Sequence, residues 1–248
     1  MIPEAEGNLR ALRDNPYPGR GIIVGMDESG GALVQVYWIM GRSANSRNRV
    51  FESEGGHVWT AAADASKVKD PSLIIYNAMR ELKGLYVVTN GDQTDTIVQA
   101  ALAGASMSQA LNTRRYEPDA PNFTPRISAV CSLRDGVPVS ELSILKKSAL
   151  GAGCDRQTFR IEQFAKGYGH CITTYAGDGD PLPSFRGEPY ILPLTGDIGG
   201  VARSIWAVLN PANRVSLAVK FIDLGNGASR LHIVNQYAKA QPPGHTGA

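Results

Sequence analysis

The feature that most constrains the fold is a series of short apolar runs separated by glycine-rich turns. The runs 20–26 and 32–40 are separated by Asp-Glu-Ser-Gly-Gly, and the runs 49–53 and 57–62 by Glu-Gly-Gly. Apolar or alternating segments of this length, joined by such turns, indicate antiparallel β-hairpins. The first quarter of the chain is therefore predicted to form two hairpins.

The rest of the chain continues in the same style and adds a few helical segments. Apolar spacing predicts helices over 70–82, 92–111 and 197–210, and Tyr76 would then lie in the middle of the first helix. The proline-rich segment 181–194 is too irregular for a regular element. Further strands are predicted over 85–89, 126–133, 140–145, 156–164, 169–177, 214–223 and 229–237. Many antiparallel strands with few helices favour an α+β layered sandwich.

Length and composition are those of an ordinary globular protein. The 248 residues suffice for one large domain, and 43% of them are hydrophobic while 19% are charged. We expect residues 1–18 to form an N-terminal arm and residues 241–248 a flexible tail. A single domain over 19–240 remains between them.

Several classes of function are disfavoured by charge and spacing. A formal net charge of +2 gives no basic surface for a nucleic acid partner, and the longest apolar runs are too short to span a membrane. The charged N-terminus does not resemble a secretion signal. Three cysteines without C-x-x-C spacing, and four histidines without ligand spacing, indicate a reduced, cytoplasmic protein with no metal site.

The junction between the predicted strand 85–89 and the predicted helix that follows is unusually polar. Its short side chains belong to Asn90, Asp92, Thr94, Asp95 and Thr96, with Gly91 beside the asparagine. One interpretation is a well-capped helix, because Asp92 and Asp95 have the spacing of a capping pattern. The other is a ligand wall for a ribose or a base edge, built on a strand-to-helix corner.

Two further loops combine charged and polar residues. The loop 41–51 contains Arg42 and Arg47, and it is either a solvated hairpin turn or a clamp for an anion such as phosphate. The stretch 116–127 is stiffened by prolines and holds Glu117 and Arg126. A stiff polar loop is suited to holding a general acid or base. Tyr76 considered alone is best explained by core packing.

Taken in chain order, these segments resemble the archaeal-type IMP cyclohydrolase family over about residues 19–237. The resemblance rests on the Arg-Ser-x-x-x-Arg loop, "IIYNAMR", "VVTNGDQTDTI", "YEPDAPNFTPRI" and "CITTYAGDGDPLPSF". It implies a four-layer αββα sandwich similar to that of N-terminal-nucleophile hydrolases. Such hydrolases need a Cys, Ser or Thr just before the first strand, and "NPYPGRGII" offers none. A terminal nucleophile is therefore disfavoured.

The resemblance also implies a reaction and a set of residues. The family closes a formamido-imidazole-carboxamide ribotide to IMP with loss of water, the last step of purine biosynthesis, and uses no cofactor. Arg47, Tyr76 and Glu117 fall on its catalytic positions. The candidates for substrate binding are Arg42 and Arg126 for the phosphate, together with Ser43, Asn90, Gly91, Thr94, Asp95, Asn122 and Thr124.

The chain also departs from the family pattern. Asp92-Gln93, the middle of the 42–47 loop and the N-terminal arm all differ from it. Two alternatives therefore stay open: a paralogue that closes a related carboxamide ribotide, and a non-catalytic module that binds purine nucleotides. The family resemblance also makes a homo-oligomer the expected state.

Overall fold

The computed structural model describes residues 2–68, 70–134 and 136–239. Within these ranges the strands form two antiparallel sheets, one with the order β11-β10-β1-β2-β12-β13 and the other with the order β3-β4-β5-β6-β7-β8-β9. The first sheet contains β1 (Gly21–Met26), β2 (Ala32–Met40), β10 (Tyr168–Thr173), β11 (Tyr190–Pro193), β12 (Arg214–Asp223) and β13 (Ser229–Asn235). The second contains β3 (Arg49–Glu54), β4 (His57–Ala62), β5 (Asn77–Leu82), β6 (Leu85–Thr89), β7 (Arg126–Arg134), β8 (Val137–Lys147) and β9 (Cys154–Ile161).

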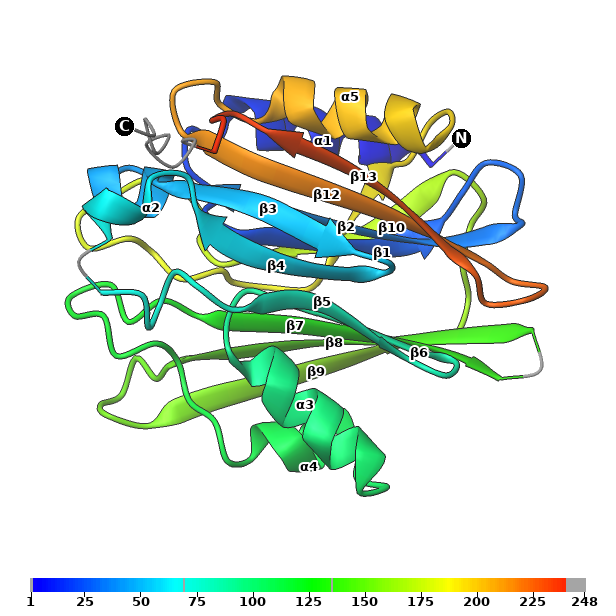
Figure 1. Cartoon of the computed structure of the whole chain (residues 1–248), viewed down its shortest axis with the longest axis horizontal. Helices are drawn as coiled ribbons and strands as arrows, with labels where there is room; N and C mark the ends of the chain where they lie inside the picture. The colour runs from blue at the N-terminus through cyan, green and yellow to red at the C-terminus, as the bar shows by residue number, and fades with distance from the viewer. Residues whose placement is uncertain (1, 69, 135, 240–248) are drawn as a thin grey trace, which may run out of the picture.

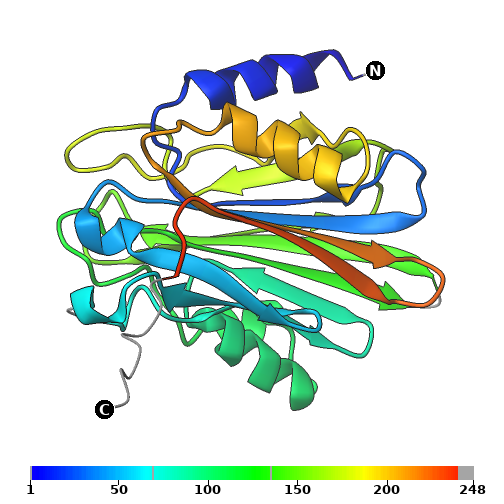
Figure 2. The ribbon, with the colours of Figure 1, turned by 45° about the horizontal axis from the view of Figure 1, so that its top comes forward.

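The two sheets lie face to face, and helices cover their outer faces (Figures 1 and 2). The helices α1 (Pro3–Asp14) and α5 (Ile198–Val208) pack on the sheet that contains β1. The helices α3 (Gln93–Leu102) and α4 (Met107–Leu111) pack on the sheet that contains β6. The expected α+β class is confirmed, and the layers run helices, sheet, sheet, helices. The predicted tail, 241–248, lies outside the described residues.

Strand β2 shows why one stretch of sequence is apolar at every position but Gln35. Its residues alternate between two cores, with Tyr37 packed between the sheets and Trp38 packed under α1 and α5. All nine residues of β2 are buried, because both faces of the strand are covered. A strand buried on both faces loses the polar alternation that a half-exposed strand would keep.

The helix predicted over 70–82 is wrong. Asp70 and Pro71 support only a single turn, in which Ser72 N–H donates to Asp70 Oδ1 and Ile74 N–H donates to Pro71 O. The chain then becomes β5 and pairs with β6 through a tight hairpin in which Gly84 has φ +68°. The Lys83-Gly84 turn signal therefore outweighs the helical spacing of the apolar residues. Tyr76 precedes a strand and is not in a helix.

Two other predicted elements also need correction. The helix predicted over 92–111 is two helices, because Gly104 adopts φ +77° and ends α3 in a Schellman motif. The N–H of Ala105 donates to Ala100 O at 2.8 Å, and Ser106 then caps α4. The segment 181–194, expected to hold no regular element, contributes β11, which pairs with β10 at the edge of the sheet.

A buried ion pair joins the two sheets on their facing sides. Lys220 on β12 places its Nζ 2.7 Å from Glu81 Oε1 on β5, and it also donates to Gly56 O. The Lys220 side chain is 0% exposed, whereas that of Glu81 is 22% exposed. Burial lowers the pKa of Lys220, and Glu81 partly offsets that effect. The ammonium group therefore depends on its partner much more than the carboxylate does.

This asymmetry predicts unequal effects when the two partners are removed. Glu81→Ala leaves a buried, unpaired ammonium group and should lower the free energy of unfolding by about 3 kcal/mol. Lys220→Met replaces the ammonium with an apolar chain and leaves a carboxylate that water can reach, so its loss should be clearly smaller. Urea denaturation of both variants measures the difference. Equal losses would contradict the dependence of Lys220 on Glu81.

Candidate functional site

A polar cavity of about 260 Å³ opens where five connecting segments meet at one end of the two sheets. These segments precede β1, join β2 to β3, join β4 to β5, precede β7 and follow β10. Its walls carry the charged side chains of Arg20, Arg42, Arg49, Glu117 and Asp119 beside the rings of Tyr17 and Tyr175. Charged groups from both sheets therefore converge on one small space.

A larger groove of about 890 Å³ lies on the outer face of the β6–β7–β8 sheet beside α3. Its walls are mostly aliphatic, with Leu102 and Val137 strongly exposed. A site for a polar reaction needs several convergent polar groups, and buried titratable groups mark it further. The smaller cavity combines these features, so it is the candidate site.

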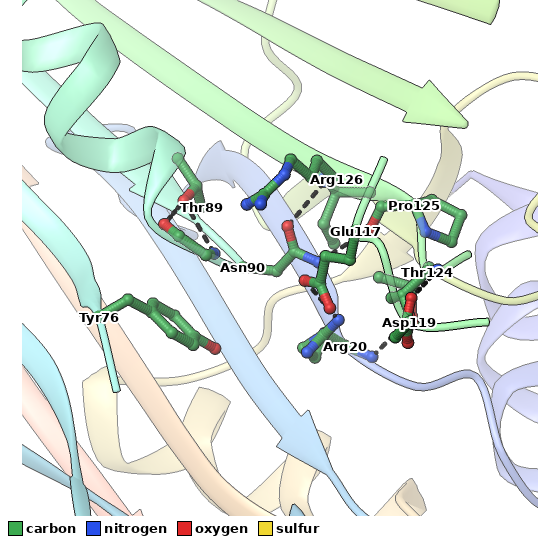
Figure 3. Close-up of polar contacts among 12 residues, drawn as sticks. Arg20, Tyr76, Thr89, Asn90, Glu117, Asp119, Thr124, Pro125 and Arg126 are labelled. Carbon is green, nitrogen blue, oxygen red and sulfur yellow. Dashed lines mark hydrogen bonds and ion pairs between the residues drawn. The ribbon is translucent and has the colours of Figure 1, made fainter. Parts of the chain in front are cut away.

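The ion pair between Arg20 and Glu117 lies at the centre of this site. Arg20 Nη2 is 2.8 Å from Glu117 Oε1, and the two residues are 9% and 3% exposed. Gly19, with φ +73°, turns the chain into β1, and the Arg20 N–H donates to Thr174 Oγ1. Figure 3 shows the two side chains meeting from opposite sides. The pair thus bridges the start of β1 and the loop before β7.

Burial and charge act in opposite directions on both partners. Burial raises the pKa of Glu117 above its ordinary value, although Arg20 and Arg126 lower it. Burial alone would lower the pKa of Arg20, but Glu117 and the nearby tyrosines hold that pKa well above its usual range. Glu117 is therefore a carboxyl group that can take up a proton closer to neutral pH than an exposed glutamate can.

Arg49 differs from Arg20 because it has no carboxylate partner among the described residues. Its Nε donates to Ser46 O at 2.8 Å and its Nη2 to Met40 O at 3.4 Å. Its Nη1 is buried without a hydrogen-bond partner in the described part of the chain. Burial, followed by repulsion from Arg20, lowers the pKa of Arg49. An uncompensated buried guanidinium that lines a cavity is suited to an anionic ligand.

Tyr76 lies beside the cavity but is not among the residues that line it. Its hydroxyl is 2.6 Å from the hydroxyl of Tyr37, and both rings are buried. Both hydroxyls are close enough to Arg20 to affect its pKa. The expectation that Tyr76 belongs to the core is therefore met, and the residue also faces the charged pair.

The structure brings together some of the residues expected from sequence. Five of them line the cavity: Arg42, Ser43, Glu117, Asn122 and Thr124. Arg42 is exposed at the rim, where it pairs with Asp178 and lies 5.0 Å from the Tyr17 ring. Arg47 is directed elsewhere, since its Nε donates to Gly41 O at 2.9 Å and its Nη2 to Asn213 Oδ1 at 3.2 Å.

The other expected residues gather at the β6–α3 corner, which is internally hydrogen-bonded. Asn90 is 0% exposed, donates to Pro125 O, and accepts from Gln93 Nε2 and from Ile127 N–H, each at 2.9 Å. Thr94 shares a 2.6 Å hydrogen bond with Thr89. The polar side chains of this corner are thus largely occupied by one another.

The aspartates of the corner do not cap α3 as the sequence suggested. Asp92 makes no hydrogen bond to the helix N-terminus and instead pairs with Arg114 and, at 2.6 Å, with Arg126. Asp95 accepts from Asn77 Nδ2 at 2.9 Å. Tertiary contacts override the local capping pattern, because both arginines come from segments that lie far from Asp92 in the sequence.

Gly91 leaves room for the close approach of Arg126. A Cβ on Gly91 would lie 2.6 Å from Arg126 Nη1, which also donates to Gln93 Oε1 at 2.6 Å. The Arg126 guanidinium is therefore already held by this corner. Its proposed phosphate contact remains a prediction.

Sequence reasoning missed several residues of the cavity wall. Arg20, Tyr17 and Tyr175 were not singled out, and Arg49 lay inside the 41–51 loop without being chosen. The available signal was a lone arginine directly before the first strand, in "PGRGII". A single arginine at a strand end has no specific meaning until its partner, Glu117, is known.

Comparison with known proteins shows the family of this chain. The family model described as "IMP cyclohydrolase-like protein" matches residues 17–227, a range that includes every charged residue of the cavity wall. The chain belongs to the IMP cyclohydrolase-like family. This confirms the family resemblance seen in the sequence motifs.

Two archaeal relatives carry the name IMP cyclohydrolase. The protein of Methanocella arvoryzae is 33% identical over 138 residues, which cover 54% of this chain and 65% of the relative. The protein of Methanopyrus kandleri is 31% identical over 118 residues, which cover 46% of this chain and 58% of the relative. Both matches span less than two thirds of the relative's length.

No group of three or more His, Cys, Asp or Glu residues among the described residues is placed to hold a metal ion. No helix in the described part of the chain has the length and hydropathy needed to cross a membrane.

The internal bonding of the corner predicts a structural role for Asn90. Asn90→Asp keeps the acceptor for Ile127 N–H but loses the donor to Pro125 O, so the free energy of unfolding should fall by about 1–3 kcal/mol. The affinity of the folded variant for IMP should stay close to that of the wild type. Thermal denaturation and calorimetric titration measure the two quantities. Weaker IMP binding with unchanged stability would instead make Asn90 a ligand contact.

Proposed function

We propose that this protein closes the pyrimidine ring of a formamido-imidazole-carboxamide ribotide, giving IMP and water, the last step of purine biosynthesis. The observation that carries the proposal is the buried Glu117 carboxyl beside Arg20 in a cavity that also holds Arg49, a guanidinium with no carboxylate partner among the described residues. Family membership supports the reaction type. A proton-transfer group and an anion-binding group in one small cavity suit an anionic substrate that must exchange protons.

The reaction makes one carbon–nitrogen bond and loses one water molecule. The carboxamide nitrogen attacks the formyl carbon of the same molecule and gives up a proton, while the formyl oxygen becomes a hydroxyl. That hydroxyl then departs as water as the former formamido nitrogen loses its proton. A neutral amide is a poor nucleophile, so the two groups must be held together and protons must be moved.

Glu117 is the proposed proton-transfer residue. As a carboxylate it accepts the proton of the attacking nitrogen and passes it to the formyl oxygen, and it then carries the proton of the formamido nitrogen to the departing hydroxyl. Arg20 holds Glu117 in place and offers positive charge near the oxygen that becomes negative. Tyr76, paired with Tyr37, is the proposed hydroxyl donor at the inner end of the site.

Arg49 and Arg42 are the proposed partners of the phosphate. Arg49 is buried and lacks a carboxylate partner among the described residues, whereas Arg42 lies at the rim. Arg47, the arginine expected from the family motif, is bonded to Gly41 and Asn213 outside the cavity lining. We therefore assign the phosphate to Arg49 and not to Arg47, which the family resemblance places at a catalytic position.

Glu117→Gln should cut turnover of the formylated ribotide by about 10²–10⁴-fold, because the amide cannot exchange protons. Affinity for IMP should change little, since glutamine can still accept a hydrogen bond from Arg20. Formation of IMP is followed by its absorbance. An unchanged rate would remove Glu117 from the mechanism.

The raised pKa of Glu117 also predicts a pH dependence. The attacking step needs the ionised carboxylate, so turnover should fall as the pH drops through the Glu117 pKa. Because burial raises that pKa, the loss should begin at a higher pH than for an exposed glutamate. Rate profiles of the wild type and of Glu117→Gln test this. An acid limb that persists in the variant belongs to another group.

Two neighbouring arginines provide a matched test of phosphate binding. Arg49→Met should weaken IMP binding by about 10- to 150-fold, the value of one charge-assisted contact, while inosine binding stays nearly constant. Arg47→Met removes the same charge from the same loop and should have much less effect. Calorimetry with both ligands measures the four affinities. A larger loss for Arg47→Met would contradict the assignment of the phosphate to Arg49.

A further inference from the structure

A short chain of hydrogen bonds lies on the cavity wall near Glu117. Asp119 Oδ1 accepts from Thr124 N–H at 2.7 Å, and Asp119 Oδ2 contacts Thr124 Oγ1. Thr124 Oγ1 is in turn 2.5 Å from the Tyr175 hydroxyl. Figure 3 shows Asp119 and Thr124 joined beside the Arg20–Glu117 pair. All three residues line the cavity, and Thr124 and Tyr175 are almost fully buried.

The number of available protons determines which group donates in each of these hydrogen bonds. An ionised carboxylate only accepts hydrogen bonds, and a threonine hydroxyl has a single proton to donate. The Thr124 proton therefore points to Asp119. The Tyr175 hydroxyl must then donate its own proton to Thr124 Oγ1, because two lone pairs cannot form a hydrogen bond with each other.

Tyr175 is left with lone pairs only. Burial raises the pKa of Tyr175, so the phenol keeps its proton near neutral pH, and that proton is used by Thr124. The ring is held by stacking on Tyr17 at 5.9 Å, and the Tyr175 N–H donates to Pro18 O. Thr124, the partner of the Tyr175 hydroxyl, also accepts from the Glu117 N–H through its backbone oxygen at 2.9 Å. A fixed acceptor therefore lies at the end of the cavity that holds the proton-transfer group.

Ring closure requires such an acceptor, an argument that rests on the proposed function. The attacking carboxamide nitrogen carries two hydrogens, of which one leaves to Glu117 and one remains on the ring nitrogen. We infer that the Tyr175 oxygen, oriented by Asp119 through Thr124, accepts the N–H that remains and so selects ligands that donate a hydrogen at that position. Asp119 is then a positioning residue, and Tyr175 determines specificity.

The inference predicts discrimination between two purine nucleotides. The six-membered ring of IMP carries N1–H, a donor, whereas N1 of adenosine 5′-monophosphate is an acceptor. If N1 of adenosine 5′-monophosphate faces the lone pairs of Tyr175, neither acceptor has a hydrogen-bond partner. A mismatch of this kind strongly weakens binding. Wild-type protein should therefore bind IMP more tightly than adenosine 5′-monophosphate.

The decisive experiment reverses the direction of donation along these hydrogen bonds. In Asp119→Asn the side-chain oxygen can still accept from Thr124 N–H, while its NH₂ group donates to Thr124 Oγ1. Thr124 can then donate to Tyr175, whose proton becomes free to point at the ligand. The ratio of IMP affinity to adenosine 5′-monophosphate affinity, measured by calorimetry, should fall by about 10-fold or more.

Two further variants keep the test decisive. Thr124→Val deprives Tyr175 of its acceptor and should lower the same ratio, which covers the case in which Asp119→Asn does not fold. Asp180→Asn removes an exposed charge from the loop after β10 and should leave the ratio unchanged.

The inference is overturned if the ratio is unchanged in both Asp119→Asn and Thr124→Val, or if it falls equally in Asp180→Asn. If the wild type converts the formylated ribotide, that failure leaves the proposed function intact. Absence of both turnover and IMP binding in the wild type overturns the two together.

Discussion

The buried ion pair between Arg20 and Glu117 couples the packing of the two sheets to the chemistry of the site. Arg20 directly precedes β1 in one sheet, and Glu117 belongs to the loop that enters β7 in the other. An unpaired charge at this depth would cost several kcal/mol, so the sheets are strongly held in the arrangement that keeps the pair together. The apolar core between the sheets stabilises their packing. The ion pair determines which side chains meet at the end of that core, where the cavity lies.

The three arginines of the cavity wall differ in whether a carboxylate neutralises them. Arg20 is neutralised by Glu117, and the rim arginine, Arg42, by Asp178. Arg49 is left without a carboxylate partner in the described residues and with one buried N–H group unsatisfied. Such an arrangement sacrifices some stability for binding, because an anionic ligand would supply the missing interaction. The unsatisfied group thus indicates where the ligand's charge belongs.

Some elements of the fold could be read from local sequence. The hairpins around Gly30 and Gly55 were predictable because each glycine permits a positive φ at a turn between apolar runs. Local signals conflicted over 70–82, where Pro71 and the apolar spacing favoured a helix while Lys83-Gly84 favoured a hairpin. Pairing of β5 with β6 and its neighbours decided that conflict. Propensity is a weak prior when sheet pairing can satisfy the backbone.

The sequence by itself determined the family, the strand-rich α+β class and the choice of Glu117 as a candidate, because each can be read from motifs and patterns along the chain. The tertiary structure decided which polar residues face the cavity. Arg47 and Arg49 are two positions apart, yet only Arg49, at the first position of β3, lines the cavity. Asn90, which looked available for a ligand, and Asp92, which looked like a helix cap, are occupied by partners from distant segments. The direction of a side chain depends on the backbone that carries it, and its availability depends on neighbours that no local pattern reveals.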